Sequence, residues 1–376
     1  MRIFLTGATG YLGSYLATLL MREHNAQLAL LVRAENEQAG ERRLWKSLQL
    51  HMDFEEFIER VRTQVRIIPG DLTSRRFGLS EGDYTRLVEE TESIIHCAAS
   101  LNRKSAKACF NVNLRGTLEM VKLAQAADAH HGLRRFSDIS TVAVAGKRSN
   151  EVVSEPHSVE WSRSDYDPYA RTKKFCEHMV HELLPEMDVR VFRPSIILGD
   201  SRFPETTQFD MVRAFVWLAQ LPVLPFDGQW RADIVPANYV AKGVVHVHMA
   251  AAPKYDTYHL SSGVDSLTYR EVVDALDGKK VKFVPGLENS FSSLIDRLSN
   301  TPRKWGLAPA ASLMKVFIPY LVFNTVFDNR RIVDELGEKP EPFSVYANAL
   351  REYARKGKFS YAYKPWPEHV EERKVA

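Results

Sequence analysis

The feature that most constrains this chain is a glycine-spaced turn close to its start. An apolar run at Ile3–Thr6 leads into Gly7-Ala8-Thr9-Gly10-Tyr11-Leu12-Gly13, and an amphipathic pattern continues over Tyr11–Glu23. Glycines let the backbone pass close to a pyrophosphate, and the following helix presents its N–H groups and positive dipole end to the phosphates. A tight structural turn is the alternative, but the order strand, turn, helix favours dinucleotide binding. The contacts are predicted at Thr6, Gly7, Thr9, Gly10, Tyr11, Leu12 and Gly13.

Short apolar runs recur between longer amphipathic segments over the first half of the chain. Several are continuous Val/Ile/Leu runs, which is typical of strands covered on both faces. A helical pattern such as Asn113–Ala127 lies between them, so we predict an α/β fold, a Rossmann-type doubly wound parallel sheet. The predicted strands are Ile3–Thr6, Leu28–Val32, Val65–Pro69, Ser93–Cys97, Arg135–Ser140 and Val189–Arg193.

The pattern changes after Gly199. Residues 200–229 are rich in Phe and Pro, and a strand at Tyr258–Ser261 and a helix at Tyr269–Leu276 follow before a mainly helical end. A length of 376 residues allows one large domain with additions or two domains. We expect residues 1–200 to form the cofactor domain. Residues 201–376 would form a smaller, mainly helical substrate lobe that interleaves with the sheet near residues 230–262.

Composition excludes several classes of protein. The formal net charge is +3 with mixed signs, and the chain is 45% hydrophobic and 26% charged, so it is neither disordered nor a nucleic-acid-binding protein with a basic stripe. Cys97, Cys109 and Cys176 form no CxxC or Cys/His cluster, so neither a disulfide framework nor a metal site is expected. Met1 leads directly into the first predicted strand, which leaves no room for a signal peptide. We therefore predict a cytoplasmic location.

The most apolar stretch near the C-terminus is Leu313–Phe323, interrupted by Lys315 and Pro319. It is too short to span a bilayer, so no transmembrane segment is expected. A buried core helix is the favoured interpretation. Peripheral membrane contact and the lining of an apolar pocket remain alternatives.

The end of the second predicted strand bears on the choice of cofactor. Leu31-Val32-Arg33-Ala34 has an arginine where an acidic residue would bind the ribose 2′-OH of NAD. Arginine instead suits a 2′-phosphate, because it is always charged and can bond it bidentately. Arg43 could close over the same group, although both arginines also fit a solvated surface. The pattern favours NADP(H).

Two later strand ends are predicted to meet the same cofactor. Gly70-Asp71-Leu72 follows the third strand, with Asp71 placed to accept a hydrogen bond from the adenine amine and Leu72 beside it. His96-Cys97-Ala98-Ala99 closes the fourth strand with small residues, and Ala98 lies where the cofactor would pass. Ordinary strand-end turns remain the alternative for both segments.

A tyrosine and a lysine share one predicted helix face. Tyr169 and Lys173 are four residues apart, and Asp167 and Pro168 are a good N-cap and first helical residue. A nearby ammonium favours the tyrosinate and lowers the phenol pKa, which makes tyrosine a usable acid or base. Ser140-Thr141 ends a predicted strand, and such ends meet ligands in parallel sheets. Together they indicate a reactive site.

The motifs of this chain, in the order in which they follow one another, resemble those of the extended short-chain dehydrogenases/reductases over residues 1–265. The resemblance is greatest to the thioester-reductase and fatty-acyl-reductase branch, through Leu31–Ala34, Arg193–Ser201 and Asp233–Pro236. The motifs are Thr6–Gly13, Leu31–Ala34, Gly70–Thr73, His96–Ala99, Asn113–Thr117, Ser140–Gly146, Tyr169–Lys173 and Arg193–Ser195.

The resemblance implies roles for individual residues. Tyr169 would be the proton donor and Thr141 the hydroxyl that polarises the carbonyl, with Ser140 as the substitute if the register differs by one. Lys173 would bind the nicotinamide ribose and tune Tyr169. Asn113 matches a position that supports the site, although a helix-capping or core-bonded asparagine is an equal alternative.

One position departs from the pattern of the branch. Pro194 and Ser195 are the implied cofactor contacts after the sixth predicted strand, and the branch often has glycine where this chain has Ser195. A serine side chain leaves less clearance for the backbone beside the nicotinamide.

The implied reaction is hydride transfer to the carbonyl of an acyl thioester. It yields an aldehyde and a thiol, and a second NADPH could reduce the aldehyde to the alcohol. No adenylation or carrier domain is recognised, so the acyl group would arrive on CoA or on a separate acyl carrier protein. The basic pair Arg103 and Lys104 could meet an acidic carrier, although both also fit solvated surface charges. A lipophilic substrate is suggested by Phe209, Phe215, Trp217, Leu221, Phe317, Tyr320, Phe323 and Phe327.

Two other functions remain open. One is an NADP(H)-dependent ketone or hydroxyl oxidoreductase or epimerase of the same superfamily, acting on a steroid-like, flavonoid-like or nucleotide-sugar substrate. Arg33 counts against epimerases that hold NAD. The other is a non-catalytic NADP(H)-binding regulator, which the presence of Thr141, Tyr169 and Lys173 disfavours.

Overall fold

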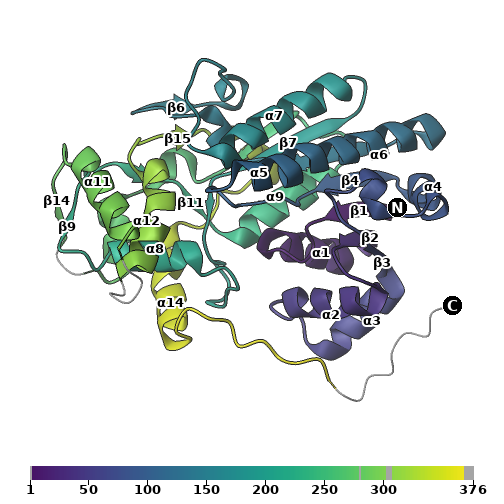
Figure 1. Cartoon of the computed structure of the whole chain (residues 1–376), viewed down its shortest axis with the longest axis horizontal. Coiled ribbons are helices and arrows are strands. Elements are labelled where there is room, and N and C mark those ends of the chain that lie inside the picture. Colours follow the sequence, from purple (N-terminus) through teal and green to yellow (C-terminus); the bar gives the residue numbers. More distant parts are fainter. Residues whose placement is uncertain (1, 279–280, 302–306, 368–376) are drawn as a thin grey trace.

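A seven-stranded parallel sheet forms the centre of the molecule in the computed structural model, which describes residues 2–278, 281–301 and 307–367 (Figure 1). The strand order is β12-β7-β5-β4-β1-β2-β3, and every pair in it is parallel. The predicted α/β fold is confirmed, and each predicted strand lies within one residue of the observed one at either end. The strands are β1 (Arg2–Thr6), β2 (Gln27–Val32), β3 (Val65–Pro69), β4 (Ser93–His96), β5 (Arg135–Ile139), β7 (Val189–Pro194) and β12 (Thr257–Leu260).

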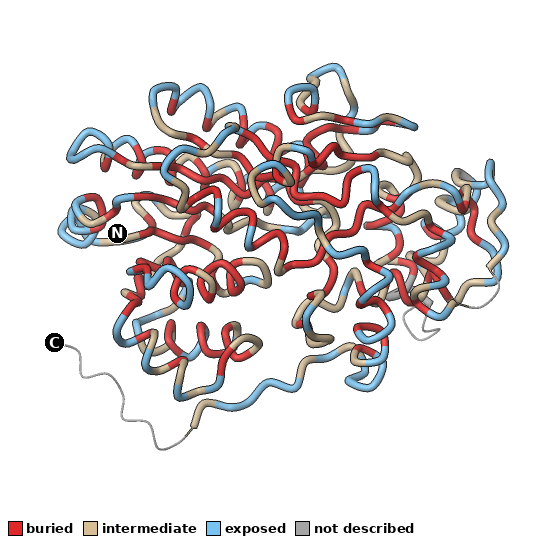
Figure 2. Tube along the Cα trace, turned by 180° about the vertical axis from the view of Figure 1, so that it is seen from behind, coloured by how far each residue is buried: buried red, intermediate tan, exposed pale blue. Residues whose placement is uncertain are grey.

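Helices cover both faces of this sheet, because side chains alternate along each strand. Ile3 and Leu5 of β1 pack in one core with α1, α2, α3 and α9, whereas Phe4 packs in a second core with α4, α6 and α7. Figure 2 shows the strands buried between these layers. The helices are α1 (Tyr11–His24), α2 (Glu37–Leu48), α3 (Phe54–Gln64), α9 (Ala237–Met249), α4 (Glu81–Glu90), α6 (Gly116–His131) and α7 (Pro168–Leu183).

The order of the strands positions the site. The chain crosses from β3, at one edge, to β4 on the other side of β1, so the strand order reverses beside β1. In open parallel sheets, ligands bind outside the carboxyl ends of the strands at such a reversal. The glycine turn follows β1 at this place, and Ala98 follows β4.

A further set of helices, here called the C-terminal lobe, builds its own apolar core beside the carboxyl ends of the strands (Figure 1). Met314, Phe317, Ile318 and Leu321 are buried there, which confirms the buried-helix interpretation of the apolar stretch. Within the described residues, none of the helices is both long and apolar enough to cross a membrane. The lobe comprises α8 (Asp210–Leu218), α10 (Tyr269–Ala275), α11 (Glu288–Ser299), α12 (Leu307–Leu321) and α14 (Phe343–Lys356).

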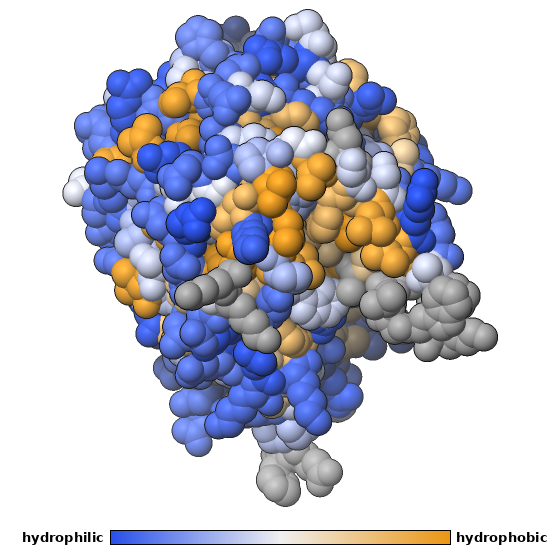
Figure 3. All heavy atoms as spheres, turned by 90° about the vertical axis from the view of Figure 1, so that its left-hand side faces the viewer, coloured by the Kyte–Doolittle hydropathy of each residue, from blue (hydrophilic) through white to orange (hydrophobic). Residues whose placement is uncertain are grey.

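Short elements connect the sheet and the lobe. Small ladders join β8 to β11, β6 to β15, β9 to β14 and β10 to β13. Figure 3, which faces the lobe, shows apolar side chains gathered on its surface, where Val223, Val284, Leu287 and Leu294 are exposed. The remaining elements are α5 (Ala106–Cys109), α13 (Arg330–Leu336), β6 (Val152–Val153), β8 (Ile196–Ile197), β9 (Val223–Leu224), β10 (Arg231–Ala232), β11 (Ile234–Val235), β13 (Leu267–Thr268), β14 (Lys282–Phe283) and β15 (Val326–Phe327).

The chain after α14 returns to the sheet as an extended segment, residues 358–367, here called the strap (Figure 1). The Trp366 ring packs edge-on against Phe54 of α3 at 5.0 Å between ring centroids. The Trp45 indole N–H donates to the Pro365 carbonyl at 3.3 Å, and the Lys364 N–H donates to the Gln49 side chain at 2.6 Å. The strap therefore ties the C-terminal lobe to α2 and α3.

Candidate active site

Two glycines of the first turn are required by close contacts. Gly7 has φ +82°, and a Cβ on it would lie 2.8 Å from the Ala98 nitrogen. A Cβ on Gly13 would lie 2.0 Å from the Gly7 carbonyl oxygen. Gly10 is the N-cap of α1, and no side chain caps that helix start. The turn thus combines a tight glycine contact with helix N–H groups that no side chain caps, which suits a pyrophosphate.

The residues around the turn hold it from behind. The buried Thr6 hydroxyl bonds Nδ1 of His96 at 2.8 Å and accepts from the Ala98 N–H at 3.2 Å. The Thr9 carbonyl accepts from the Ser47 hydroxyl at 2.8 Å. The side chain of Thr6 therefore joins β1 to the segment after β4, and a cofactor contact would have to come from its backbone.

Tyr11 and Leu12 begin α1. Burial raises the pKa of Tyr11 to about 12, although hydrogen bonds with Thr206 and Tyr15 act to lower it. Leu12 packs against the core that contains α1 and α2. Both side chains therefore pack within the protein, and Tyr11 reaches toward the segment that leads into the C-terminal lobe.

Arg33 and Arg43 meet at the carboxyl end of β2. Both side chains are exposed, and the Arg43 guanidinium donates to the Arg33 carbonyl at 2.6 Å. An exposed cationic pair beside the glycine turn suits a phosphate group.

The end of β3 lies next to this pair, since Val32 of β2 is opposite Pro69. One oxygen of Asp71 accepts from both the N–H and the hydroxyl of Thr73, each at 2.8 Å. The Leu72 side chain packs on Gly116, and a Cβ added to Gly116 would lie 2.7 Å from Cγ of Leu72. The Asp71 carboxylate is therefore already engaged by its own turn.

The helix α7 begins as predicted. The Asp167 side chain accepts from the Ala170 N–H at 2.9 Å, and Pro168 is the first helical residue. Tyr169 and Lys173 both point into the protein, with 7% and 2% of their surface exposed. Thr141 is the second residue after β5, and its hydroxyl lies beside the Tyr169 phenol and favours the ionised form.

The serine next to Thr141 faces other groups. The Ser140 hydroxyl donates to the buried Glu177 carboxylate, which also pairs with Arg193 at 2.7 Å. Ser140 is therefore part of a buried ion-pair network. Thr141 is the hydroxyl that the fold brings to Tyr169.

Several groups, and not Lys173 alone, influence the pKa of Tyr169. Burial is the largest effect and raises the pKa of Tyr169, whereas Lys173, Arg103 and Thr141 act to lower it. The net direction is upward, opposite to the lowering expected from the Tyr/Lys spacing, because that spacing does not show how deeply the phenol is buried.

Lys173 has a buried anionic partner. Its Nζ lies 3.6 Å from Oδ1 of Asp138 on β5, a residue with no exposed surface. Burial is the largest single effect and opposes the charge of Lys173, but the charge interactions around it, of which that with Asp138 is the largest, together outweigh burial and raise the pKa of that lysine. Lys173 is therefore protonated at neutral pH.

Asn113 braces the site through its amide. It lies in a π-helical segment, Phe110–Arg115, and accepts from the Ser100 N–H at 2.7 Å. Its amide N–H donates to the Thr172 hydroxyl at 3.0 Å. Asn113 therefore joins the segment after β4 to the helix that carries Tyr169, which agrees with the core-bonded alternative.

Pro194 ends β7, and Ser195 follows it. The Ser195 N–H donates to the Leu260 carbonyl at 3.0 Å, and its hydroxyl is buried. Asp233 lies beside it, and burial raises the pKa of Asp233 to about 6, although the Ser262 N–H donates to its carboxylate at 2.8 Å and acts to lower that pKa. Ser195 and Asp233 thus form a buried polar group at the boundary, here called the seam, between the sheet and the C-terminal lobe.

Three residues of the site were not predicted as such. Asp138 and Glu177 could have been suspected, since Asp138 is acidic within a buried strand and Glu177 continues the four-residue spacing of Tyr169 and Lys173. Arg103, considered above as a surface charge for carrier contact, instead lies with its guanidinium 5.2 Å from the Tyr169 ring centroid. Lys104 is exposed.

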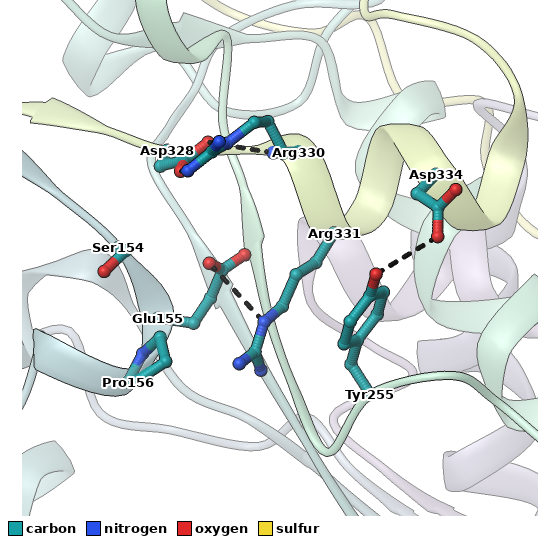
Figure 4. Close-up of a pocket in the computed structure, with 8 residues that line it drawn as sticks. All are labelled: Ser154, Glu155, Pro156, Tyr255, Asp328, Arg330, Arg331 and Asp334. Carbon is teal, nitrogen blue, oxygen red and sulfur yellow. Dashed lines mark hydrogen bonds and ion pairs between the residues drawn. The ribbon is translucent and has the colours of Figure 1, made fainter.

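A separate pocket lies along the outer edge of β12 (Figure 4). Two pairs of its charged side chains form ion pairs: Glu155 lies 3.8 Å from Arg331, and Arg330 lies 2.6 Å from Asp328. Tyr255 donates to Asp334 at 3.2 Å. Among the described residues, no cluster of three or more His, Cys, Asp or Glu side chains could hold a metal ion.

Comparison with known proteins places this site in a family. The model of the family described as male sterility protein matches residues 5–244. A linear gramicidin synthase chain of Brevibacillus parabrevis is 30% identical over 280 residues, which are 73% of this chain and 5% of that protein. L-2-aminoadipate reductase of Schizosaccharomyces pombe is 28% identical over 277 residues, 67% of this chain and 19% of that protein. This chain thus spans only a small part of either relative.

The fold has a close counterpart among solved structures. The terminal R domain from the myxalamid PKS-NRPS biosynthetic pathway superposes with a TM-score of 0.79 at 23% identity, covering 96% of this chain and 92% of that one. At this identity the likeness concerns the fold. With the family match, it confirms the resemblance derived from the motifs. The chain belongs to the male sterility protein family, in the thioester-reductase branch of the extended short-chain dehydrogenases/reductases, a superfamily of oxidoreductases.

Proposed function

We propose that the chain is an NADPH-dependent reductase that converts an acyl thioester into an aldehyde and a free thiol. The observation that carries the proposal is the convergence of Thr141, Tyr169 and Lys173 at the carboxyl ends of β5 and the strands beside it. A buried phenol with a hydroxyl and an ammonium beside it can donate a proton to a carbonyl oxygen. The family match and the two curated relatives support the thioester class.

The residues fit a dinucleotide with a 2′-phosphate. The close contact of Gly13 with Gly7 and the uncapped start of α1 suit the pyrophosphate. Arg33 and Arg43 supply two exposed cations where the 2′-phosphate of NADPH would lie, beside Asp71 and the end of β3. Lys173 and the backbone around Pro194 and Ser195 would hold the nicotinamide end.

The nicotinamide, when bound, supplies a hydride to the carbonyl carbon. As electrons move onto the carbonyl oxygen, Tyr169 donates its phenolic proton to that oxygen and Thr141 donates a hydrogen bond to it. Lys173, which lies beside Asp138, stays protonated and stabilises the tyrosinate that remains. The hemithioacetal product then breaks its C–S bond: the hydroxyl loses its proton as the C=O bond forms, and the departing sulfur gains that proton and leaves as the thiol.

The substrate we propose is lipophilic and is delivered on CoA or on a separate acyl carrier protein. Support comes from the lobe, where Phe317 and Tyr320 of α12 stand beside Arg103 and so close to Tyr169. A second round of reduction, from aldehyde to alcohol, would use the same three residues. These chemical classes define the assay.

The test is NADPH oxidation by the purified chain with acyl-CoA, acyl-carrier protein, ketone and nucleotide-sugar substrates, with aldehyde and alcohol identified as products. Thioester turnover is expected, and the Tyr169→Phe variant should lose about 10²–10⁴-fold in kcat because it has no proton to donate. Unchanged NADPH binding in that variant is the control for folding. Turnover of ketones or sugars alone would overturn the thioester assignment. A variant with undiminished kcat would overturn the role of Tyr169.

The cofactor assignment has its own test. Arg33→Ala should raise the Kd of NADPH by about 10–100-fold, since charged hydrogen bonds to the phosphate are lost. NADH lacks the 2′-phosphate and serves as the internal control, with an unchanged Kd. An equal loss for both cofactors would contradict the placement of the 2′-phosphate at Arg33.

A further inference from the structure

Arg103 lies against the face of the tyrosine that we assign as proton donor. It belongs to the segment between β4 and α5, and its Cζ is 5.2 Å from the centroid of the Tyr169 ring. The same guanidinium is 5.4 Å from the Phe317 ring and 5.0 Å from the Tyr320 ring, both on α12. Arg103 thus lies among three aromatic rings, one from α7 and two from the C-terminal lobe.

Polar contacts hold the guanidinium in this place. Its Nε lies 3.5 Å from the carboxylate of Asp167, the N-cap of α7, and donates to the Tyr320 hydroxyl at 3.3 Å. The Tyr320 hydroxyl in turn donates to Asp167. Tyr166 stacks on the Tyr320 ring at 4.7 Å between centroids. The position of Arg103 is therefore set jointly by the start of α7 and the end of α12.

A cation over an aromatic face is attracted to the ring, and the attraction grows when the ring carries negative charge. The charged groups that act on Tyr169 are Lys173 on α7, Arg103, and Asp167 at the N-cap of α7. Tyr320 on α12 contacts Arg103 and Asp167. Asp167 disfavours the tyrosinate, but Arg103 has a larger effect and favours it. Asp138, which faces Lys173 from β5, completes the charge around the phenol.

We propose that Arg103 is a positioning residue of the reaction, a second cation that stabilises the Tyr169 tyrosinate and is held over it by Tyr320 of the C-terminal lobe. The proposal rests on the proposed function, in which Tyr169 gives and takes the proton. It means that the lobe bears on the proton donor as well as on the substrate.

The experiment uses the reverse reaction, in which aldehyde and thiol combine and NADP⁺ is reduced. This direction requires the tyrosinate as base, so the rate increases with pH until Tyr169 is ionised. Arg103→Gln raises the pKa of Tyr169 by about one unit, by the size expected for a lost nearby charge. The reverse rate at pH 8 should therefore decrease by about 10-fold, and the loss should shrink only as the pH passes the pKa of Tyr169, which burial holds above its ordinary value near 10.

Three variants make the result specific. Arg103→Lys keeps the charge and should recover most of the reverse rate at pH 8. Lys104→Gln, at the exposed neighbouring position, should leave the pH profile unchanged. Tyr169→Phe should abolish the reverse reaction in every background.

The outcomes separate the two proposals. A loss in Arg103→Gln of the same size at every pH, or Arg103→Lys behaving like Arg103→Gln, would overturn the role of Arg103 and leave the proposed function intact. An active Tyr169→Phe variant would overturn the proposed function itself. Melting temperatures and NADPH binding, measured for each variant, identify a folding defect, and the Arg103→Lys profile then decides the question.

Discussion

The sheet and the C-terminal lobe contribute to the site in different ways. Around the sheet, the site residues stand at strand ends or helix starts, as Gly7, Thr141 and Tyr169 do. The lobe acts through contacts between residues far apart in sequence, such as Tyr320 with Asp167, which are 153 positions apart. The difference shows that the chemistry is built locally around a parallel sheet, whereas the surroundings of the proton donor are assembled over the whole chain.

Of the comparisons between the two regions, the largest effect is expected at the glycine turn beside the sheet, whose close backbone contact depends on Gly13. In Gly13→Ala, the new Cβ would lie 2.0 Å from the Gly7 carbonyl, so the turn must move and NADPH binding should weaken by more than about 10-fold, with a stability loss of about 1–3 kcal/mol. Calorimetric titration and thermal unfolding measure both. Gly82→Ala in α4 is the matched control, since nothing lies within 4 Å of its added Cβ. Normal NADPH binding by Gly13→Ala would contradict the assignment of the turn.

The seam between the two regions should show an effect of intermediate size. Burial raises the pKa of Asp233 to about 6, above its ordinary value near 3.9. A carboxyl whose folded pKa is raised contributes stability at low pH, and the contribution is lost as pH increases through about 4 to 6. Asp233→Asn should therefore be more stable than the parent at pH 8, by about 3 kcal/mol, with the difference fading towards pH 4. Denaturant unfolding at several pH values measures this, and a difference independent of pH would exclude titration of Asp233 as its source.

The smallest effect is expected at the strap, which ties the lobe back to the sheet. Trp366→Ala removes the ring packed on Phe54 and Phe57 and should lower the free energy of unfolding by about 1–2 kcal/mol. Trp366→Phe, which keeps an aromatic ring there, is the control. Because the Trp366 ring packs on α3 and not on the residues assigned to the chemistry, kcat should stay the same within about twofold. A large loss of kcat would mean that the strap influences the chemistry, and the separation between the two regions would then fail.

Much of the fold was predictable because its signals are local. The strands were recognisable as short apolar runs, and the N-cap Asp167 with Pro168 indicated the start of α7 correctly. The position of Arg103 was not predictable from local signals. As a charged residue in a loop it was considered for carrier contact on the surface, and the structure instead packs it on Tyr169. No nearby pattern marks that contact, since its other partners lie on α7 and α12.

The choice between Ser140 and Thr141 shows the same limit. Adjacent residues at a strand end point to opposite sides, and the sequence does not tell which side holds the phenol. The tertiary contacts decide between them: the Ser140 hydroxyl donates to Glu177, and the Thr141 hydroxyl lies beside Tyr169.

By itself, the sequence determined the doubly wound sheet, the glycine turn and the Tyr/Lys pair, because hydrophobic periodicity, helix capping and close glycine contacts act between neighbouring residues. Only the tertiary structure decided the electrostatics around Tyr169. Burial raises the pKa of Tyr169, Asp138 lies beside Lys173, and Arg103 lies between the rings of Tyr169 and Tyr320. These effects depend on which groups share a desolvated space, and that is settled only when distant segments pack together.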